Sequence, residues 1–141
     1  MKKIIYQGRL EGDFIGFDDG MLFETLNGQF WIQAVYKYWY HYAYRPEVVI
    51  YLENNRHYLS VGNEKIQVNR LTDVIKSSID GEFTGWAGDS VYKLNNGQKW
   101  QQSVYKYEYK YAYSPDVVVY NDGTQMRMNV AGTSAKVKRV I

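Results

Sequence analysis

Tyrosine is the most abundant side chain in this sequence with chemistry suited to ligand binding. The chain of 141 residues has 15 tyrosines and 4 tryptophans, but 2 histidines and no cysteine. Ten tyrosines fall in two runs in which every second residue is tyrosine: Tyr36, Tyr38, Tyr40, Tyr42 and Tyr44, then Tyr105, Tyr107, Tyr109, Tyr111 and Tyr113. Regularly spaced aromatic rings can stack on nucleic-acid bases, sugar rings or peptide prolines. These two runs are called the tyrosine ladders below.

Groups that catalyse reactions or bind metals have no suggestive arrangement. With two histidines and no cysteine, a zinc site would need two carboxylates as well, and no spacing indicates one. Neither Ser60 nor Ser90 has a histidine at a spacing that suggests a catalytic triad. We therefore expect a protein that is not an enzyme and that has no metal and no cofactor. The alternative is a weak hydrolase in which the aligned carboxylates Asp13 and Glu82 act as general acid and base.

Basic residues are concentrated in the second half of the chain. Positions 10–72 contain 5 basic and 8 acidic residues, whereas positions 79–141 contain 8 basic and 6 acidic residues. Non-specific nucleic-acid binding needs a concentrated basic face, because neutralisation of phosphates supplies most of its affinity. The candidates for such a face are Lys106, Lys110, Lys136, Lys138 and Arg139. Edge-strand lysines that deter aggregation explain the same residues equally well.

An internal duplication accounts for the two ladders. At an offset of 69 and without a gap, residues 10–72 and 79–141 are identical at 23 of 63 positions. A weaker match extends towards the N-terminus, so we predict a first repeat over 4–72 and a second over 73–141. Residues 73–78 are expected to form a short joint of about one helical turn.

Each repeat is predicted to be all-β. Asn-Gly at positions 27–28 and 96–97 lies between apolar runs and indicates a hairpin, since both residues tolerate the positive φ of a type I′ turn. Two further hairpins are indicated by Asn54-Asn55 with Asp122-Gly123 and by Gly62-Asn63 with Gly132-Thr133. No segment longer than one turn keeps a helical period. Five or six short antiparallel strands in each repeat predict a small barrel, and we expect the SH3-like type.

The ladder tyrosines share one face of a strand, because side chains alternate with a period of two. A nine-residue strand would be about 30 Å long, more than a small barrel needs, so we expect a bend or bulge partway. Pro46 and Pro115 end the ladders, since proline cannot donate to a neighbouring strand. For the central tyrosines we favour a position in the barrel core, with the polar opposite face in solvent. The alternative is that the rings form an exposed ligand platform.

Other aromatic positions are also shared by the repeats, namely Phe14 with Phe83, Phe17 with Trp86, and Trp31 with Trp100. We favour the core for all six. The alternative places Phe17 and Trp86 at the mouth of a groove beside the tyrosines, as in SH3-like peptide binders. The candidate ligand-binding residues are Phe17, Trp31, Tyr40, Tyr42, Tyr44, Trp86, Trp100, Tyr109, Tyr111 and Tyr113.

The order of the shared motifs is specific. The pattern Gly-x-Phe-x-Gly-Trp, then Asn-Gly-Gln-x-Trp-Gln-Gln, then Tyr-Lys-Tyr-x-Tyr-x-Tyr-Ala-Tyr-x-Pro is nearly complete in the second repeat, at Gly81–Trp86, Asn96–Gln102 and Tyr105–Pro115. The first repeat departs from it at Phe17 and Ile32. This series resembles a repeat in a bacterial family of small tandem-repeat β-barrel proteins. The resemblance covers most of both repeats, and it implies a small β-barrel and no established activity.

Composition narrows the class of protein. An apolar content of 45% with 23% charged residues is typical of a soluble globular chain. No uncharged stretch approaches the roughly 18 apolar residues of a membrane span, so no membrane association is expected, and the absence of cysteine favours the cytoplasm. We expect a non-catalytic binding or adaptor protein that recognises a protein or peptide segment through exposed aromatic residues. The alternative is a nucleic-acid-binding module that uses the basic second repeat.

Overall fold

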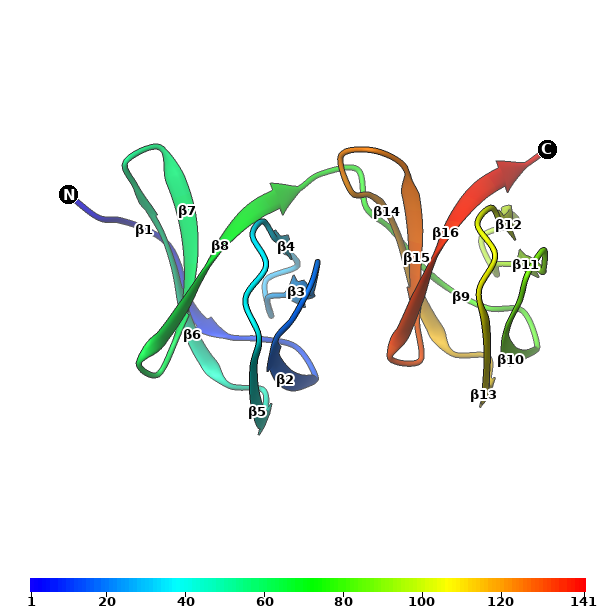
Figure 1. Cartoon of the computed structure of the whole chain (residues 1–141), viewed down its shortest axis with the longest axis horizontal. Coiled ribbons are helices and arrows are strands. Elements are labelled where there is room, and N and C mark those ends of the chain that lie inside the picture. Colours follow the sequence, from blue (N-terminus) through cyan, green and yellow to red (C-terminus); the bar gives the residue numbers. More distant parts are fainter. The chain divides into compact units, whose positions relative to one another are not determined.

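The computed structural model describes all residues, Met1–Ile141, and consists of strands without any helix. The chain forms two compact units, Met1–Thr72 and Asp73–Ile141. Each unit contains one six-stranded antiparallel sheet and one two-stranded sheet (Figure 1). The prediction of an all-β chain with two small barrel-like units is therefore confirmed. No helix has the length and apolar character that crossing a membrane would require.

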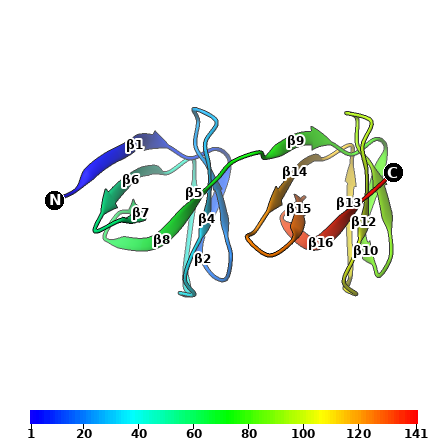
Figure 2. The ribbon, with the colours of Figure 1, turned by 90° about the horizontal axis from the view of Figure 1, so that it is seen from above.

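The first unit has eight strands. Its six-stranded sheet has the order β1-β6-β7-β8-β4-β3, and β2 pairs with β5 in the two-stranded sheet. Within this unit, Figure 2 shows β1, β6, β7 and β8 on one side and β2, β4 and β5 on the other. The strands are β1 (Lys3–Arg9), β2 (Asp13–Phe17), β3 (Leu22–Glu24), β4 (Phe30–Gln33), β5 (Trp39–Tyr44), β6 (Glu47–Glu53), β7 (Arg56–Val61) and β8 (Glu64–Leu71).

The second unit repeats this arrangement. Its six-stranded sheet has the order β11-β12-β16-β15-β14-β9, and β10 pairs with β13. The strands are β9 (Ile75–Ser78), β10 (Glu82–Ala87), β11 (Val91–Lys93), β12 (Lys99–Gln102), β13 (Tyr107–Tyr113), β14 (Asp116–Asn121), β15 (Met126–Val130) and β16 (Thr133–Val140). The expected helical turn in the joint is wrong, because residues 75–78 form strand β9. This strand pairs with β14, and Ile75 packs against the core.

The predicted hairpins are present, but one predicted turn type is wrong, and the turn predicted at Gly132-Thr133 lies at Ala131-Gly132 instead, since Thr133 already belongs to β16. Asn54 and Asn55 connect β6 to β7 with φ of 54° and 63°, as a type I′ turn requires. In the Asn-Gly pair at 27–28, only Gly28 has a positive φ, and the Thr25 N–H donates to the Gln29 carbonyl at 2.9 Å. The Asn-Gly hairpins therefore close through a longer loop than a two-residue turn.

Each unit has its own aromatic core. Phe17 and Trp31 in the first unit are 2% and 1% exposed, and Trp86 and Trp100 in the second are 1% and 4% exposed. The core interpretation of these residues is confirmed. The alternative that Phe17 and Trp86 lie at the mouth of a groove beside the tyrosines stays a prediction: both rings are almost fully buried, but Phe17 also lines a small hollow beside Tyr38 and Tyr40. The Trp86 indole donates to the Thr133 hydroxyl at 3.1 Å within the second core.

Candidate functional site

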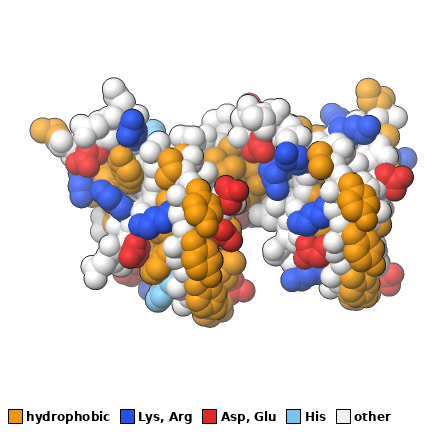
Figure 3. All heavy atoms as spheres, in the orientation of Figure 1, with side chains coloured by type: hydrophobic (Ala, Val, Ile, Leu, Met, Phe, Trp, Pro, Cys, Tyr) orange, Lys and Arg blue, Asp and Glu red, His pale blue; other side chains and the backbone are white.

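The tyrosine ladders lie on the surface of both units. Exposure of the side chains ranges from 55% to 69% in the first ladder and from 52% to 78% in the second. Figure 3 shows each ladder as a continuous stripe of hydrophobic side chains. The prediction that the central tyrosines form the barrel core is therefore wrong. At about 200 Å² for each ring, one ladder exposes roughly 600 Å², the upper end for the largest apolar patch on a monomer.

Some of the alternate positions of the ladders face inward instead, whereas His41 and Lys110 are exposed. In the first unit, Trp39 and Ala43 pack against the core. In the second unit, Lys106 and Glu108 are partly buried and find partners on β16. The Lys106 ammonium donates to the Ser134 carbonyl at 2.8 Å, and the Thr133 hydroxyl donates to Glu108 at 2.8 Å. The Thr133 hydrogen bond lowers the pKa of the Glu108 carboxyl. Polarity was a misleading guide here, because long polar side chains can turn inward when the rim supplies partners.

A bulge and a glycine fix the course of each ladder strand. Phe14 pairs with Ala43 but Gly16 pairs with Tyr40, so β5 has one extra residue, as expected from the ladder's length. The same shift occurs between β10 and β13. A Cβ on Gly16 would lie 1.9 Å from the Trp39 carbonyl oxygen, so only glycine allows the two backbones to approach this closely.

Buried glutamines hold the segment that leads into each ladder. Tyr36 and Tyr38 precede β5, and Tyr105 precedes β13, so no sheet hydrogen bonds fix them. Gln102 is 3% exposed, and its amide donates to the Val104 carbonyl at 3.1 Å and to the Lys106 carbonyl at 2.8 Å. Its oxygen accepts the Gly88 N–H at 3.0 Å.

Gln33 is the equivalent residue of the first unit. It donates to the Val35 carbonyl at 2.9 Å and accepts the Asp18 N–H at 3.1 Å. Our sequence reasoning did not single out these two positioning residues. Their identity in both repeats was the signal that could have found them.

A carboxylate from the neighbouring strand binds the fourth tyrosine of each ladder. The Tyr42 hydroxyl donates to Asp13 at 2.9 Å, and the Tyr111 hydroxyl donates to Glu82 at 3.2 Å. These hydrogen bonds, together with the negative charge, raise the pKa of both tyrosines. Asp13 and Glu82, the carboxylates of the hydrolase alternative, therefore accept hydrogen bonds from ladder tyrosines. They also place a negative charge within each aromatic row.

The ladder strands also have an unpaired edge. β5 pairs only with β2, and β13 pairs only with β10, so the far edge of each leaves its backbone donors and acceptors open. Beside the first ladder is a hollow of about 150 Å³. Its lining includes Ile15, Phe17, Met21, Tyr38 and Tyr40. Rings, an open strand edge and a small apolar hollow thus lie together in the first unit.

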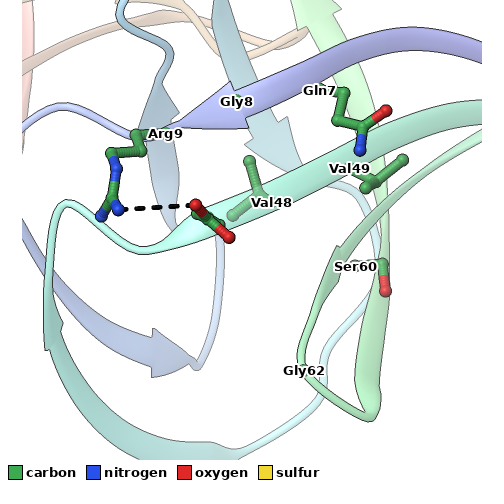
Figure 4. Close-up of a pocket in the computed structure, with 8 residues that line it drawn as sticks. Gln7, Gly8, Arg9, Val48, Val49, Ser60 and Gly62 are labelled. Atoms are coloured by element: carbon green, nitrogen blue, oxygen red, sulfur yellow. Dashed lines mark hydrogen bonds and ion pairs between the residues drawn. The ribbon is translucent and has the colours of Figure 1, made fainter.

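A larger cavity of about 420 Å³ lies elsewhere in the first unit, between β1, β6 and β7 (Figure 4). Arg9 and Glu47 form an ion pair of 3.4 Å at its edge, and Ser60 lies in its wall. No histidine and no ladder tyrosine lines this cavity. His57, on the same strand as Ser60, has its ring centroid 5.1 Å from that of Trp31. The cavity therefore brings no histidine to Ser60.

The predicted nucleic-acid residues are only partly brought together. Lys106 and Lys136 line one hollow of about 280 Å³ in the second unit, together with Tyr105 and Arg127. Lys110, Lys138 and Arg139 are exposed and do not line this hollow. Arg127 was missed, because only the pairing of β15 with β16 places it beside Lys136.

The chain has no group of three or more His, Asp or Glu side chains placed to hold a metal ion. Comparisons of the chain with protein-family models, with curated proteins and with solved structures found no match. The function is therefore inferred from the geometry of the two units alone.

Proposed function

We propose that this protein is a non-catalytic binding or adaptor protein that recognises a peptide segment of another protein through its tyrosine ladders. The observation that supports this proposal is the exposure of all ten ladder tyrosines, although each unit has a complete core without them. Contiguous aromatic surface of this size marks an interaction site. Tyrosine suits that role because it offers a large ring together with a hydroxyl that remains solvated.

A peptide fits the ladder better than other ligands do. Neighbouring rings along a strand are about 6.7 Å apart, and proline or aliphatic side chains can stack on such a row. The open edges of β5 and β13 can accept the backbone of an extended segment. In the first unit, the hollow of about 150 Å³ has room for one small apolar side chain.

The finer assignments belong to the same proposal. We infer that the barrels are of the SH3-like type, which is consistent with two small units of short antiparallel strands. Membership of the bacterial tandem-repeat family rests on the shared motifs. A cytoplasmic location is favoured by the absence of cysteine.

Nucleic-acid binding by the second unit is the second candidate. It is favoured by Lys106 and Lys136, which line a hollow next to Tyr105. The carboxylates of Asp13 and Glu82 count against it, because they would repel a phosphate backbone laid along the ladders. Binding of a single-stranded oligonucleotide with an affinity that falls steeply as salt rises would support this candidate over the peptide.

Selection from a random peptide library displayed on phage tests the proposal. The bait is the full chain, and the counter-selection uses a variant in which Tyr40, Tyr42, Tyr109 and Tyr111 are replaced by serine. A matched control variant with phenylalanine at the same four positions keeps the rings. Because the four side chains are exposed, the serine and the phenylalanine variants should both fold.

We expect selected peptides to bind the serine variant at least about tenfold more weakly than the wild type, a loss of about 1.4 kcal/mol. The phenylalanine variant should bind them within about threefold of the wild type, since stacking needs the ring and not the hydroxyl. Peptides that bind the serine variant as tightly as the wild type would disprove the proposed role of the ladders.

A further inference from the structure

Two basic side chains stand directly opposite each other on the six-stranded sheet of the second unit. Arg127 of β15 pairs with Lys136 of β16. Residues opposite each other in an antiparallel pair have Cβ atoms about 5 Å apart, and like charges there are destabilising. The first unit has Tyr58 and Gln67 at these positions, also paired and both uncharged. The fold itself therefore does not require two positive charges at this place.

A third cation converges on the same strand. The Lys106 ammonium donates to the Ser134 carbonyl at 2.8 Å, and the Arg127 guanidinium donates to the Ser134 hydroxyl at 3.2 Å. Lys136 follows two residues later on the same face of β16. Lys106, Arg127 and Lys136, together with Tyr105 and Ser134, surround the hollow of about 280 Å³. This site is called the basic hollow below.

The space in the basic hollow is consistent with substitutions between the repeats. In the first unit, the Lys65 ammonium lies over the ring of Tyr58, 5.2 Å from its centroid. The second unit has Ser134 in place of Lys65 and Arg127 in place of Tyr58. The short serine side chain leaves open the room that the lysine chain occupies in the first unit.

The cations of the basic hollow are only partly neutralised. Lys106 has Glu108 at 3.4 Å, and Arg127 has Asp122 at 3.9 Å. Lys136 has no carboxylate within ion-pair distance. In the first unit, Glu64 neutralises Lys37 at 2.9 Å, and the second unit has the neutral Thr133 at that position. A net positive charge therefore remains around the hollow.

We propose that the basic hollow binds a phosphate group on a phosphorylated side chain of the peptide segment that the ladder holds. This inference rests on the proposed function for the identity of the partner, but not for the site itself. A phosphate has about two negative charges and three acceptor oxygens, which match three cations from three elements. Arg127 offers a planar pair of donors, and the two lysines offer mobile point charges. Tyr105, the first residue of the second ladder, lines the hollow, so the site continues that row of rings.

The site can be tested without any peptide, by NMR titration of the full chain with inorganic phosphate. The variant R127Y/K136Q installs the residues of the first unit at the same pair, and it should fold because the sister repeat accommodates them. We expect saturable shifts of the Ser134 and Lys136 amides, and an affinity at least about tenfold lower in the variant. No saturable shift, or an equal affinity in the variant, would overturn the site whatever the outcome for the ladders.

The source of the phosphate is tested with one selected ladder-binding peptide, synthesised with serine or with phosphoserine at either end. We expect one phosphorylated form to bind the wild type at least about tenfold more tightly than the serine form, and R127Y/K136Q to lose that gain. Equal affinity of the serine and phosphoserine forms would overturn the phosphopeptide assignment. If a ten-residue oligothymidine binds the hollow more tightly than either peptide does, the phosphopeptide assignment is overturned in favour of nucleic acid.

Discussion

Replacement of Gly85 by alanine tests whether the ladder strand depends on close backbone contact. Gly85 has φ of 104°, and a Cβ there would lie 1.9 Å from the Glu108 carbonyl oxygen and 2.8 Å from the Lys110 nitrogen. Both atoms belong to the backbone of β13, so no side-chain rotation relieves the contact. β10 and β13 must therefore separate around the bulge.

The cost can be worked from two contributions. A non-glycine residue at this φ costs about 1–3 kcal/mol, and loss of two or three sheet hydrogen bonds costs about 1 kcal/mol each. The sum, about 4 kcal/mol, is most of the roughly 5 kcal/mol of stability expected for a small domain. We therefore expect Gly85→Ala to unfold or nearly unfold the second unit.

Gly81→Ala is the matched control. Gly81 also has a positive φ, 95°, but a Cβ there would meet nothing within 4 Å. Only the backbone strain remains, so we expect a loss of about 1–3 kcal/mol. The free energy of unfolding of each variant is measured by urea denaturation of the full chain, with NMR signals that report on each unit separately. If Gly85→Ala costs no more than Gly81→Ala, the reasoning from backbone contact is refuted.

Three further variants are predicted from other contacts. Gln102→Met should lower the free energy of unfolding of the second unit by about 2–4 kcal/mol, because the backbone groups that Gln102 binds lose their partner; urea denaturation measures it, and a loss below about 1 kcal/mol would contradict it. Ala131→Gly should stabilise the second unit by up to about 1 kcal/mol, since Ala131 has φ of 51° where the first unit has Gly62; an unchanged or lower urea midpoint would count against that strain. Asp13→Asn should bring the raised pKa of Tyr42 down towards its ordinary value of about 10, as followed by NMR of the tyrosine ring. Because that pKa is higher in the folded state, the hydrogen bond from Tyr42 to Asp13 stabilises the folded wild type below a pH of about 10, and this stabilisation is lost as the pH rises through the folded pKa. An unchanged Tyr42 pKa in the variant would exclude Asp13 as the cause.

Much of the fold could be predicted because its signals are local or repeated. The hairpins follow from turn residues such as Asn54 and Asn55, and the second barrel-like unit follows from the duplication. The bulge could be expected because a nine-residue strand is too long for a small barrel. Burial of Trp31 and Trp100 also followed from sequence, since large shared aromatic residues in a β unit are most often core residues.

The direction of the ladders could not be predicted, because a period of two fixes only that the tyrosines share a face. Which face is buried depends on partners distant in sequence, such as Ser134 for Lys106 and Thr133 for Glu108. The basic hollow was missed for a similar reason. Arg127 meets Lys136 through the register of β15 with β16, which is set by a turn at Ala131-Gly132 and not at the predicted Gly132-Thr133.

Whether the tyrosine ladders form the binding surface can be observed with ring-labelled tyrosine. NMR spectra of the full chain labelled on tyrosine rings separate the ladder tyrosines from the five that lie outside the ladders, Tyr6, Tyr51, Tyr58, Tyr92 and Tyr120. On addition of a peptide selected by phage display, we expect saturable shifts of ladder rings and unchanged signals from those five. Shifts confined to tyrosines outside the ladders, with the ladder rings unmoved at saturation, would contradict it.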